Sequence, residues 1–381
     1  MKQLLKNCEL FDGREVHTDC ALLIDGDSIS HIIAAGDVPD GVDKIIDLHG
    51  NLLAPGLIDL QVNGGGGVLF NDDPSVETLQ RMVAAHRPFG TTAMLPTLIS
   101  DDGKTMQRGI AAVAAAIQEG IAGIAGIHLE GPHLSSAFRG VHDASMMRDL
   151  DKDAESVLTS LPAGRTLLTV APETMPSTTI RRLCDAGMIV FGGHSAATYE
   201  GTVEALRAGL TGFTHLFNAM TPLTSRAPGM VGAALEDTDS YFGIIADGHH
   251  VHPATLRLAI AAKTRGKAML VSDAMPCVGT ASKSFELNGE TVTVNSGRCL
   301  TPDGTLAGSA IGLIDAVRNV CRFGGVSRYE ALNMASRYPA EAIGLAASHG
   351  LACPGYRANL IELDNNLNVV RSWIGGDLEE F

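Results

Sequence analysis

Four polar residues each close a short apolar run, and their types could carry out hydrolytic chemistry. Glu130 ends GIAGIHLE, His194 ends GMIVFGGH, His215 ends LTGFTH and Asp273 ends KAMLVSD. One glutamate and two histidines are a plausible three-ligand zinc set, which leaves a fourth position open for water. We therefore predict that Glu130, His194 and His215 bind a divalent metal ion. Asp273 is the predicted catalytic acid/base, because a carboxylate beside such a site can move protons between water and a leaving amine.

Structural roles are the alternative for all four residues. A lone histidine in a strand is usually a hydrogen-bonded core residue, and Asp273 could cap a helix or act as an additional ligand. His128 is a rival ligand, because alternate residues of a strand share a face and His128 lies two positions before Glu130. We expect His128 to support the ligands rather than bind the ion.

Strands must position these residues, and the chain offers eight candidates that alternate with helical stretches. Polar residues at the carboxyl ends of barrel strands form the catalytic face of an α/β barrel. The predicted fold class is therefore α/β, a (β/α)8 TIM-like barrel. The strand candidates end near residues 63, 97, 130, 171, 194, 215, 247 and 273. Helices are expected at 75–88, 104–118, 146–160, 176–186, 198–209, 252–264, 309–322 and 328–345, with a β-hairpin at 285–294.

The two ends of the chain differ from this pattern. Residues 1–50 contain short alternating runs bounded by Asp-Gly, which are typical of β-hairpins. Strand-like runs return after Pro354-Gly355, so we expect both termini to form one small β-sandwich domain. The predicted domains are the N-terminal part of the β domain at 1–53, the barrel at 54–350 and the C-terminal part at 351–381.

Composition limits the classes of partner. The chain has 28 basic and 43 acidic residues and a net charge of −15, which argues against nucleic acid and anionic membranes as partners. Seven dispersed cysteines without a CxxC pair suggest reduced thiols. The N-terminus has no apolar segment typical of a signal peptide, and no run is long enough to cross a membrane. We therefore expect a cytoplasmic protein.

Three late loops carry residues that could bind an anion. Arginine recognises phosphate or carboxylate through paired hydrogen bonds, and barrel phosphate sites often use late loops. Arg226 could equally be a solvated loop charge and His250 a structural turn residue, and spacing alone leaves both possibilities open. The candidates are Asn218, Ala219, Arg226, Asp247, Gly248, His249 and His250.

Two further segments could contact a substrate. Val141 and His142 lie in the loop after the Glu130 strand, where His142 could polarise a carbonyl or simply be a surface histidine. Leu306, Ala307 and Gly308 precede a predicted helix, so their backbone donors could meet a ligand. A plain helix start is the alternative for this second segment.

Together, these motifs resemble the amidohydrolase superfamily, and within it the deacetylases of phosphorylated amino sugars. The matching segments occur in the family's order and span nearly the whole chain. They are residues 55–64, 128–132, 170–173, 193–195, 214–220, 245–250 and 272–274.

The resemblance implies hydrolysis of the acetamide of N-acetylglucosamine 6-phosphate to glucosamine 6-phosphate and acetate, a reaction of amino-sugar catabolism and cell-wall sugar recycling. Glu130, His194 and His215 match the metal ligands, and Asp273 matches the acid/base. His142 matches a residue that contacts the sugar or its acyl group. His250 matches a residue that reaches the phosphate of a neighbouring subunit, which implies a homodimer. Phosphate-side contacts match Asn218, Ala219 and Arg226, and a substrate-lining loop matches Leu306, Ala307 and Gly308.

The first predicted strand departs from the wider superfamily. That superfamily begins with a His-x-His pair, whereas this chain has Gln61-Val-Asn63. Neutral amides are poor metal ligands beside carboxylate and imidazole. The resemblance therefore implies one divalent ion per subunit, with zinc favoured.

Two other functions compete with this one. A barrel amidohydrolase acting on a cyclic amide usually carries the first-strand histidine pair, which Gln61 and Asn63 replace. The second is a non-catalytic barrel that only binds its ligand. Such a protein would not need all four of the residues Glu130, His194, His215 and Asp273.

Overall fold

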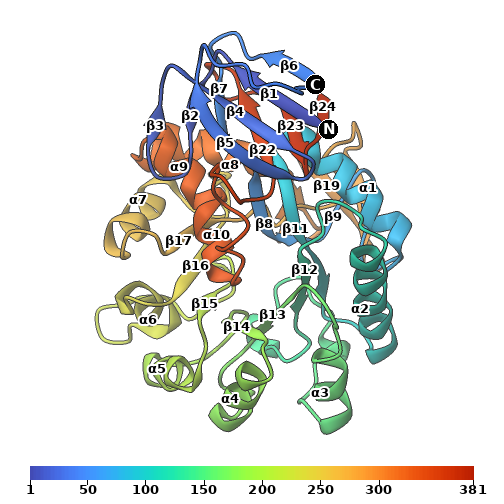
Figure 1. The fold of residues 1–381 in the computed structure, drawn as a ribbon. Helices are drawn as coiled ribbons and strands as arrows, with labels where there is room; N and C mark the ends of the chain where they lie inside the picture. The colour runs from blue at the N-terminus through green and yellow to red at the C-terminus, as the bar shows by residue number, and fades with distance from the viewer.

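A closed barrel of eight parallel strands forms the centre of the computed structural model, which describes residues 1–381 (Figure 1). Neighbouring strands follow one another in chain order, and a bridge between Val62 and Ala274 joins the last strand region to the first. The predicted (β/α)8 fold is confirmed. The strands are β8 (Leu57–Val62), β11 (Thr91–Ile99), β12 (Gly126–Glu130), β13 (Arg165–Val170), β14 (Ile189–Gly192), β15 (Gly212–Phe213), β16 (Tyr241–Ile244) and β17 (Ala268–Leu270).

Helices surround this barrel, and several begin where a polar side chain accepts a backbone N–H, as Ser75, Asp102 and Thr198 do. No helix is long and apolar enough to cross a membrane. The helices are α1 (Val76–His86), α2 (Gly103–Gln118), α3 (Lys152–Leu158), α4 (Ser177–Asp185), α5 (Tyr199–Ala208), α6 (Gly229–Glu236), α7 (Pro253–Ala262), α8 (Leu313–Asn319), α9 (Arg328–Ala335) and α10 (Arg337–Ala342).

Three helix predictions need correction, and one helix was missed. The predicted 146–160 helix starts only at Lys152, because the Asp151 side chain caps it there. Helix α6 was not predicted, since it begins after Pro228 without a side-chain cap. The predicted 328–345 helix breaks at Ser336, whose φ of −134° and ψ of −73° are not helical. The predicted 309–322 helix begins at Leu313 and ends in a π-helical turn.

Strands from both chain ends form two sheets beside the barrel, at the top of Figure 1. Trp373 is fully buried between them, and Gln3 donates a hydrogen bond to the Gly376 carbonyl at 2.7 Å, which ties the two ends together. The domain boundaries at 53 and 351 remain predictions. One sheet has β5 (Ser28–Ala34), β4 (Cys20–Asp25), β1 (Lys2–Lys6) and β6 (Lys44–Asp47). The other has β24 (Asp377–Glu380), β23 (Val369–Ile374), β22 (Leu360–Leu363), β7 (Leu52–Pro55), β2 (Glu9–Phe11) and β3 (Val16–His17).

A four-stranded sheet is inserted after the last barrel strand. Only its first hairpin was predicted, and its last strand occupies the segment expected to begin a helix. Ser309 fixes this sheet to the barrel, because its N–H donates to the Asp273 carbonyl at 2.8 Å and its carbonyl accepts from Met275 at 3.1 Å. The strands are β18 (Ser284–Leu287), β19 (Glu290–Asn295), β20 (Arg298–Leu300) and β21 (Leu306–Ser309). A short two-stranded hairpin, β9 (Gly64–Gly65) and β10 (Val68–Leu69), follows β8.

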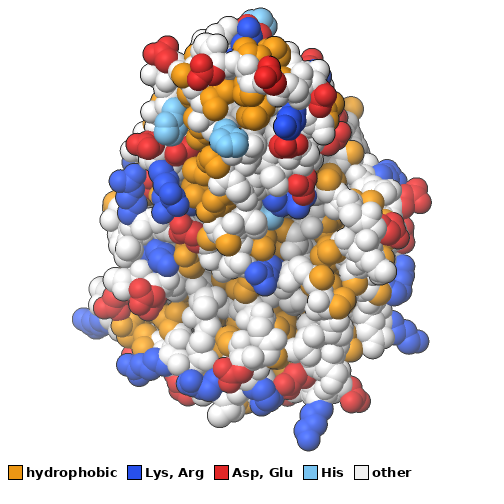
Figure 2. All heavy atoms as spheres, in the orientation of Figure 1, with side chains coloured by type: hydrophobic (Ala, Val, Ile, Leu, Met, Phe, Trp, Pro, Cys, Tyr) orange, Lys and Arg blue, Asp and Glu red, His pale blue; other side chains and the backbone are white.

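Charged side chains of both signs are interspersed over the face shown in Figure 2, with apolar side chains scattered among them.

Lys263 stabilises the end of α6 from a buried position. Its Nζ donates to the carbonyls of Ala234 and Asp237, at 2.7 and 2.5 Å, and to the Ser240 hydroxyl at 3.1 Å. Lys263→Met leaves these acceptors without a donor, so we expect the free energy of unfolding to fall by about 2–3 kcal/mol. Urea unfolding followed by circular dichroism measures the loss. The exposed Lys104→Met variant is the control, and equal midpoints for the two variants would contradict the assignment.

Candidate active site

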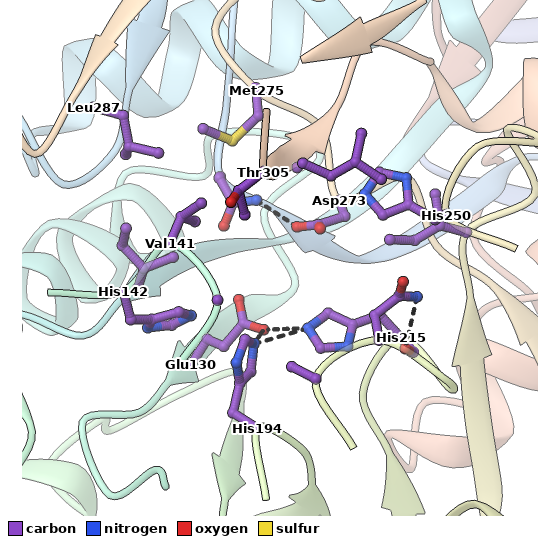
Figure 3. Close-up of a pocket in the computed structure, with 18 of the residues that line it drawn as sticks. Glu130, Val141, His142, His194, His215, His250, Asp273, Met275, Leu287 and Thr305 are labelled. Carbon is purple, nitrogen blue, oxygen red and sulfur yellow. Dashed lines mark hydrogen bonds and ion pairs between the residues drawn. The ribbon is translucent and has the colours of Figure 1, made fainter. Parts of the chain in front are cut away.

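A cavity of about 460 Å³ opens at the carboxyl ends of the barrel strands. Most of the predicted site residues line it, and the labelled side chains in Figure 3 point into it from the barrel loops and from the inserted sheet. The lining residues are Asn63, Leu69, Ile99, Glu130, Phe138, Gly140, Val141, His142, His194, His215, Asn218, Ala219, Ile245, His250, Asp273, Met275, Leu287, Gly304, Thr305, Leu306 and Gly308.

Three of these side chains converge on one point. Glu130 is the last residue of β12, and His194 and His215 each follow the end of a neighbouring strand by two residues. Glu130 Oε1 lies 3.2 Å from His194 Nε2 and 3.0 Å from His215 Nε2 (Figure 3). The two Nε2 atoms are 3.0 Å apart, and all three residues are buried. The predicted set is therefore assembled as a candidate metal-binding cluster.

The chemistry of these atoms fits a bound cation. A carbonyl can only accept, so the 2.9 Å contact between His194 Nδ1 and the Phe138 carbonyl puts the proton of a neutral ring on Nδ1. The lone pair of Nε2 then faces the Glu130 carboxylate and the second imidazole. Burial opposes ionisation of Glu130, but its close contacts with the His194 and His215 rings outweigh burial and hold the pKa of Glu130 well below its usual value. A divalent cation would neutralise this crowded set of electron-pair donors.

Strained backbone accompanies the cluster. His194 (φ 48°), His215 (φ 31°) and Asp273 (φ 52°) all adopt left-handed conformations. Such conformations are uncommon for residues other than glycine, and they concentrate at functional sites. The strain turns each side chain out of its strand direction and into the cavity.

Asp273 lies beside the cluster and is held by an amide. Asn63 Nδ2 donates to Asp273 Oδ1 at 2.6 Å. Burial raises the pKa of the Asp273 carboxyl to about 6, and the negative charge of Glu130 adds to this rise. A carboxylate with such a pKa can both accept and return a proton near neutral pH.

The Gln61 and Asn63 side chains bind carboxylates. Gln61 Nε2 donates to both oxygens of Glu130, at 3.0 and 3.1 Å. Sequence reasoning treated this pair only as poor ligands and missed that each amide positions one essential carboxylate. Their position two residues apart on the first barrel strand was the available signal.

His142 is buried, so the surface alternative is wrong. Its Nδ1 accepts the Ser100 backbone N–H at 3.2 Å and lies 2.9 Å from the Ser100 hydroxyl. Burial and, to a smaller extent, the neighbouring His194 ring lower the pKa of His142 to about 3. The neutral ring therefore carries its proton on Nε2, where it can donate a hydrogen bond.

His128 does not line the cavity. Its Nε2 lies 2.8 Å from the Thr169 hydroxyl, and burial lowers its pKa to about 4. It is therefore a hydrogen-bonded residue of the barrel interior and does not belong to the converging set.

The anion-binding candidates separate into two groups. Asn218, Ala219 and His250 line the cavity, whereas Arg226 is exposed and lies outside its lining. Asp247 also lies outside the lining, but its Oδ2 is 2.6 Å from His250 Nδ1, so it orients that ring. The cavity lining does not include Gly248 or His249.

The Leu306–Gly308 segment reaches the cavity as a strand. The alternative of a plain helix start is wrong, because residues 306–309 pair with β20 as β21 and the helix begins only at Leu313. Leu306 and Gly308 line the cavity, but Ala307 is buried on the opposite face, as alternation along a strand requires. Sequence reasoning missed Leu287 and Thr305, which also come from the inserted sheet.

Comparison with known proteins gives consistent matches. The sequence model of the amidohydrolase family matches residues 52–378, and that of the NagA composite domain matches residues 4–53. N-acetylgalactosamine-6-phosphate deacetylase of Shewanella sp. (strain ANA-3) is 43% identical over 331 residues, which cover 87% of this chain and 84% of that protein. N-acetylglucosamine-6-phosphate deacetylase of Haemophilus influenzae is 35% identical over 384 residues and is covered completely, as is this chain. The crystal structure of N-acetylglucosamine-6-phosphate deacetylase from Pasteurella multocida has a TM-score of 0.96 and 36% identity, and the match covers 100% of both chains.

Proposed function

The chain belongs to the amidohydrolase family, and from that premise we propose that it hydrolyses the acetamide of N-acetylglucosamine 6-phosphate to glucosamine 6-phosphate and acetate. The convergence of Glu130, His194 and His215 beside Asp273 carries this proposal, because it supplies a cation site and a proton-transfer group in one cavity. The cavity volume of about 460 Å³ lies in the range of small-molecule sites.

Each residue of the site has a role in the proposed reaction. A divalent ion held by the converging set would supply Lewis-acid polarisation of the acetyl carbonyl. Asp273 takes a proton from the attacking water and then transfers it to the departing amine nitrogen. The His142 Nε2–H donates to the carbonyl oxygen as negative charge develops on it. Asn63 keeps the Asp273 carboxylate in place during both transfers.

We infer the remaining assignments from the same site. A single ion, which we propose to be zinc, suits a cavity in which Gln61 and Asn63 replace a second pair of histidines. Asn218 and Ala219 would contact the phosphate from inside the cavity. His250 lines the same cavity, so we propose that it contacts the phosphate of its own subunit rather than that of a neighbouring one, as the resemblance implied. We further propose a homodimer in the cytoplasm, with the exposed Arg226 contributing to phosphate binding.

The relatives also favour a second candidate substrate. The Shewanella protein, named for the galactosamine epimer, has the higher identity of the two relatives reported above, although it covers less of this chain. The two sugar phosphates differ only in the configuration at C4. The two substrates can be ranked by measuring kcat/KM for acetate release from each epimer on one metal-loaded preparation. A larger value for N-acetylgalactosamine 6-phosphate would reassign the principal substrate without changing the reaction.

Arg226→Ala is expected to raise KM for the phosphorylated sugar about tenfold or more, since a charge-assisted pair contributes about 1.5–3 kcal/mol. The same variant should process unphosphorylated N-acetylglucosamine like wild type. Steady-state acetate release with both sugars makes the comparison, and Arg181→Ala, on α4, is the matched control. Equal losses for the two sugars would remove Arg226 from phosphate binding.

The pH dependence should report Asp273. Only the ionised carboxylate can accept the proton of water, so kcat/KM should fall as the pH drops through the Asp273 pKa of about 6. Asn63→Leu removes the hydrogen bond that favours the ionised form, and we expect the acid limb to move up by about 0.5–1 pH unit. A pH profile of each protein shows the shift. An acid limb that stays in place would mean that another group controls it.

A further inference from the structure

Two thiols meet at the junction between the barrel and the inserted sheet. All seven cysteines are free, and the Sγ atoms of Cys277 and Cys299 are 3.7 Å apart. No other pair of cysteine sulfurs is in hydrogen-bond contact. Cys277 is 8% exposed and Cys299 is fully buried, so a small reagent would reach Cys277 first.

Both cysteines belong to segments that shape the active site. Cys277 follows Asp273 by four residues and the cavity residue Met275 by two. Cys299 lies in β20, which pairs with β21, the strand that brings Leu306 and Gly308 to the cavity. The thiol pair therefore joins two adjacent segments that both line the site, since Ala274 of the first pairs with Ser309 at the end of the second.

The geometry permits a bond after a small movement. Bonded sulfurs lie about 2.05 Å apart, so the two atoms must approach by about 1.7 Å, a shift that rotation of the side chains can largely supply. A hydrogen bond from the Cys299 thiol lowers the pKa of Cys277, and the positive charge of Lys283 contributes to the same effect. The thiolate form is the nucleophile toward oxidants.

We propose that Cys277 and Cys299 form an oxidation-sensitive site, at which a hydroperoxide converts the two thiols to a disulfide that reversibly lowers turnover. The Cys277 thiolate attacks the peroxide O–O bond, forming a sulfenic acid and releasing hydroxide, which is protonated to water when hydrogen peroxide is the oxidant. The Cys299 sulfur then displaces the sulfenic oxygen as a second water and forms the S–S bond. The two thiols together lose two electrons, and these two electrons reduce one molecule of peroxide.

Turnover should fall because the bond pulls the segment after Asp273 toward β20. Ser309 couples the same segment to β21 through the Asp273 carbonyl and the Met275 N–H. Misplacement of a catalytic group by about 1 Å can cost about a hundredfold in rate, so a partial displacement of Asp273 should cost about tenfold. No cysteine is among the proposed metal ligands, and oxidation therefore leaves the cation site chemically intact.

Peptide mass spectrometry of the metal-loaded protein, before and after hydrogen peroxide, tests the site. Trypsin places Cys277 alone in residues 268–283 and Cys299 alone in residues 299–318. We expect these two peptides to become linked without a reductant and to separate with dithiothreitol. Acetate release should fall about tenfold in the oxidised protein and recover with dithiothreitol; this second readout rests on the proposed function, whereas the linked peptide does not.

Variants distinguish the effect of this disulfide from the effects of oxidation elsewhere in the protein. Cys277→Ala and Cys299→Ala should each keep the starting activity and resist peroxide, and either one suffices if the other folds poorly. Cys184→Ala, which removes a thiol of α4 far along the chain from this pair, should respond like wild type. Absence of the linked peptide, or a linked peptide without loss of turnover, would overturn the proposal. Lack of acetate release before oxidation would instead count against the proposed function.

Discussion

Asp273→Asn is expected to lower kcat about a thousandfold while the protein keeps its metal ion. The amide cannot accept a proton from water, and positioned acid–base groups contribute about 10²–10⁴-fold to turnover. Asn63, which donates to the Asp273 carboxylate, can still donate to the amide oxygen, so the fold around the site should survive. Acetate release and metal content, measured on the same preparation, give both quantities.

A control separates this loss from a general effect of removing a carboxylate. Asp101→Asn changes a carboxylate that bonds to Asn71 rather than to the reacting groups, and its turnover should stay within about twofold of wild type. Asp273→Asn protein that retained a tenth of wild-type turnover would contradict the acid/base assignment. Loss of the metal together with activity would instead make Asp273 a ligand.

Glu130→Gln should abolish stoichiometric metal binding and, with it, detectable turnover. Glu130 supplies the only negative charge in the converging set, and its Oε1 lies 3.2 Å from His194 Nε2 and 3.0 Å from His215 Nε2. An amide at position 130 would also bring its own NH₂ group against the Gln61 donor. Changes outside the ligand set cost about 10–100-fold in affinity, so loss of a charged ligand should cost more than about a hundredfold.

Inductively coupled plasma mass spectrometry and a competition titration with a chelator measure this effect. His128→Asn is the informative control, because His128 was the rival ligand and its ring bonds to Thr169 instead. We expect this control to bind one ion per subunit even if its melting temperature falls. Wild-type metal content in Glu130→Gln would contradict the proposed ligand set.

Much of the site could be predicted from the sequence, because a polar residue that closes an apolar run marks the end of a strand. Each of Glu130, His194 and His215 closes an apolar run, and the carboxyl ends of neighbouring barrel strands meet at one face. The apolar character of the run and the polarity of the residue that closes it can both be recognised within one short segment of the sequence. The fold class and the converging set therefore followed from patterns within single segments.

The missed features depend on contacts between distant segments. The spacing of Gln61 and Asn63 places both side chains on one face of a strand. It does not identify their partners, Glu130 and Asp273, which are 69 and 210 residues away along the chain. The 306–309 segment became a strand because β20 and Ala274 offered partners, a tertiary effect that overrides a helix-start pattern. Arg226 is exposed and lies outside the cavity lining of one chain, so its contact with the phosphate stays a prediction.

Acetate release from N-acetylglucosamine 6-phosphate and from N-acetylglucosamine, measured side by side on zinc-loaded wild-type protein, tests the central claim most directly. Fast release from the phosphorylated sugar and slow release from the other is the result expected of a metal-dependent deacetylase with a phosphate-binding cavity. Absence of release from either sugar, with one ion bound per subunit, would contradict the proposed function and leave only the barrel and its cation site.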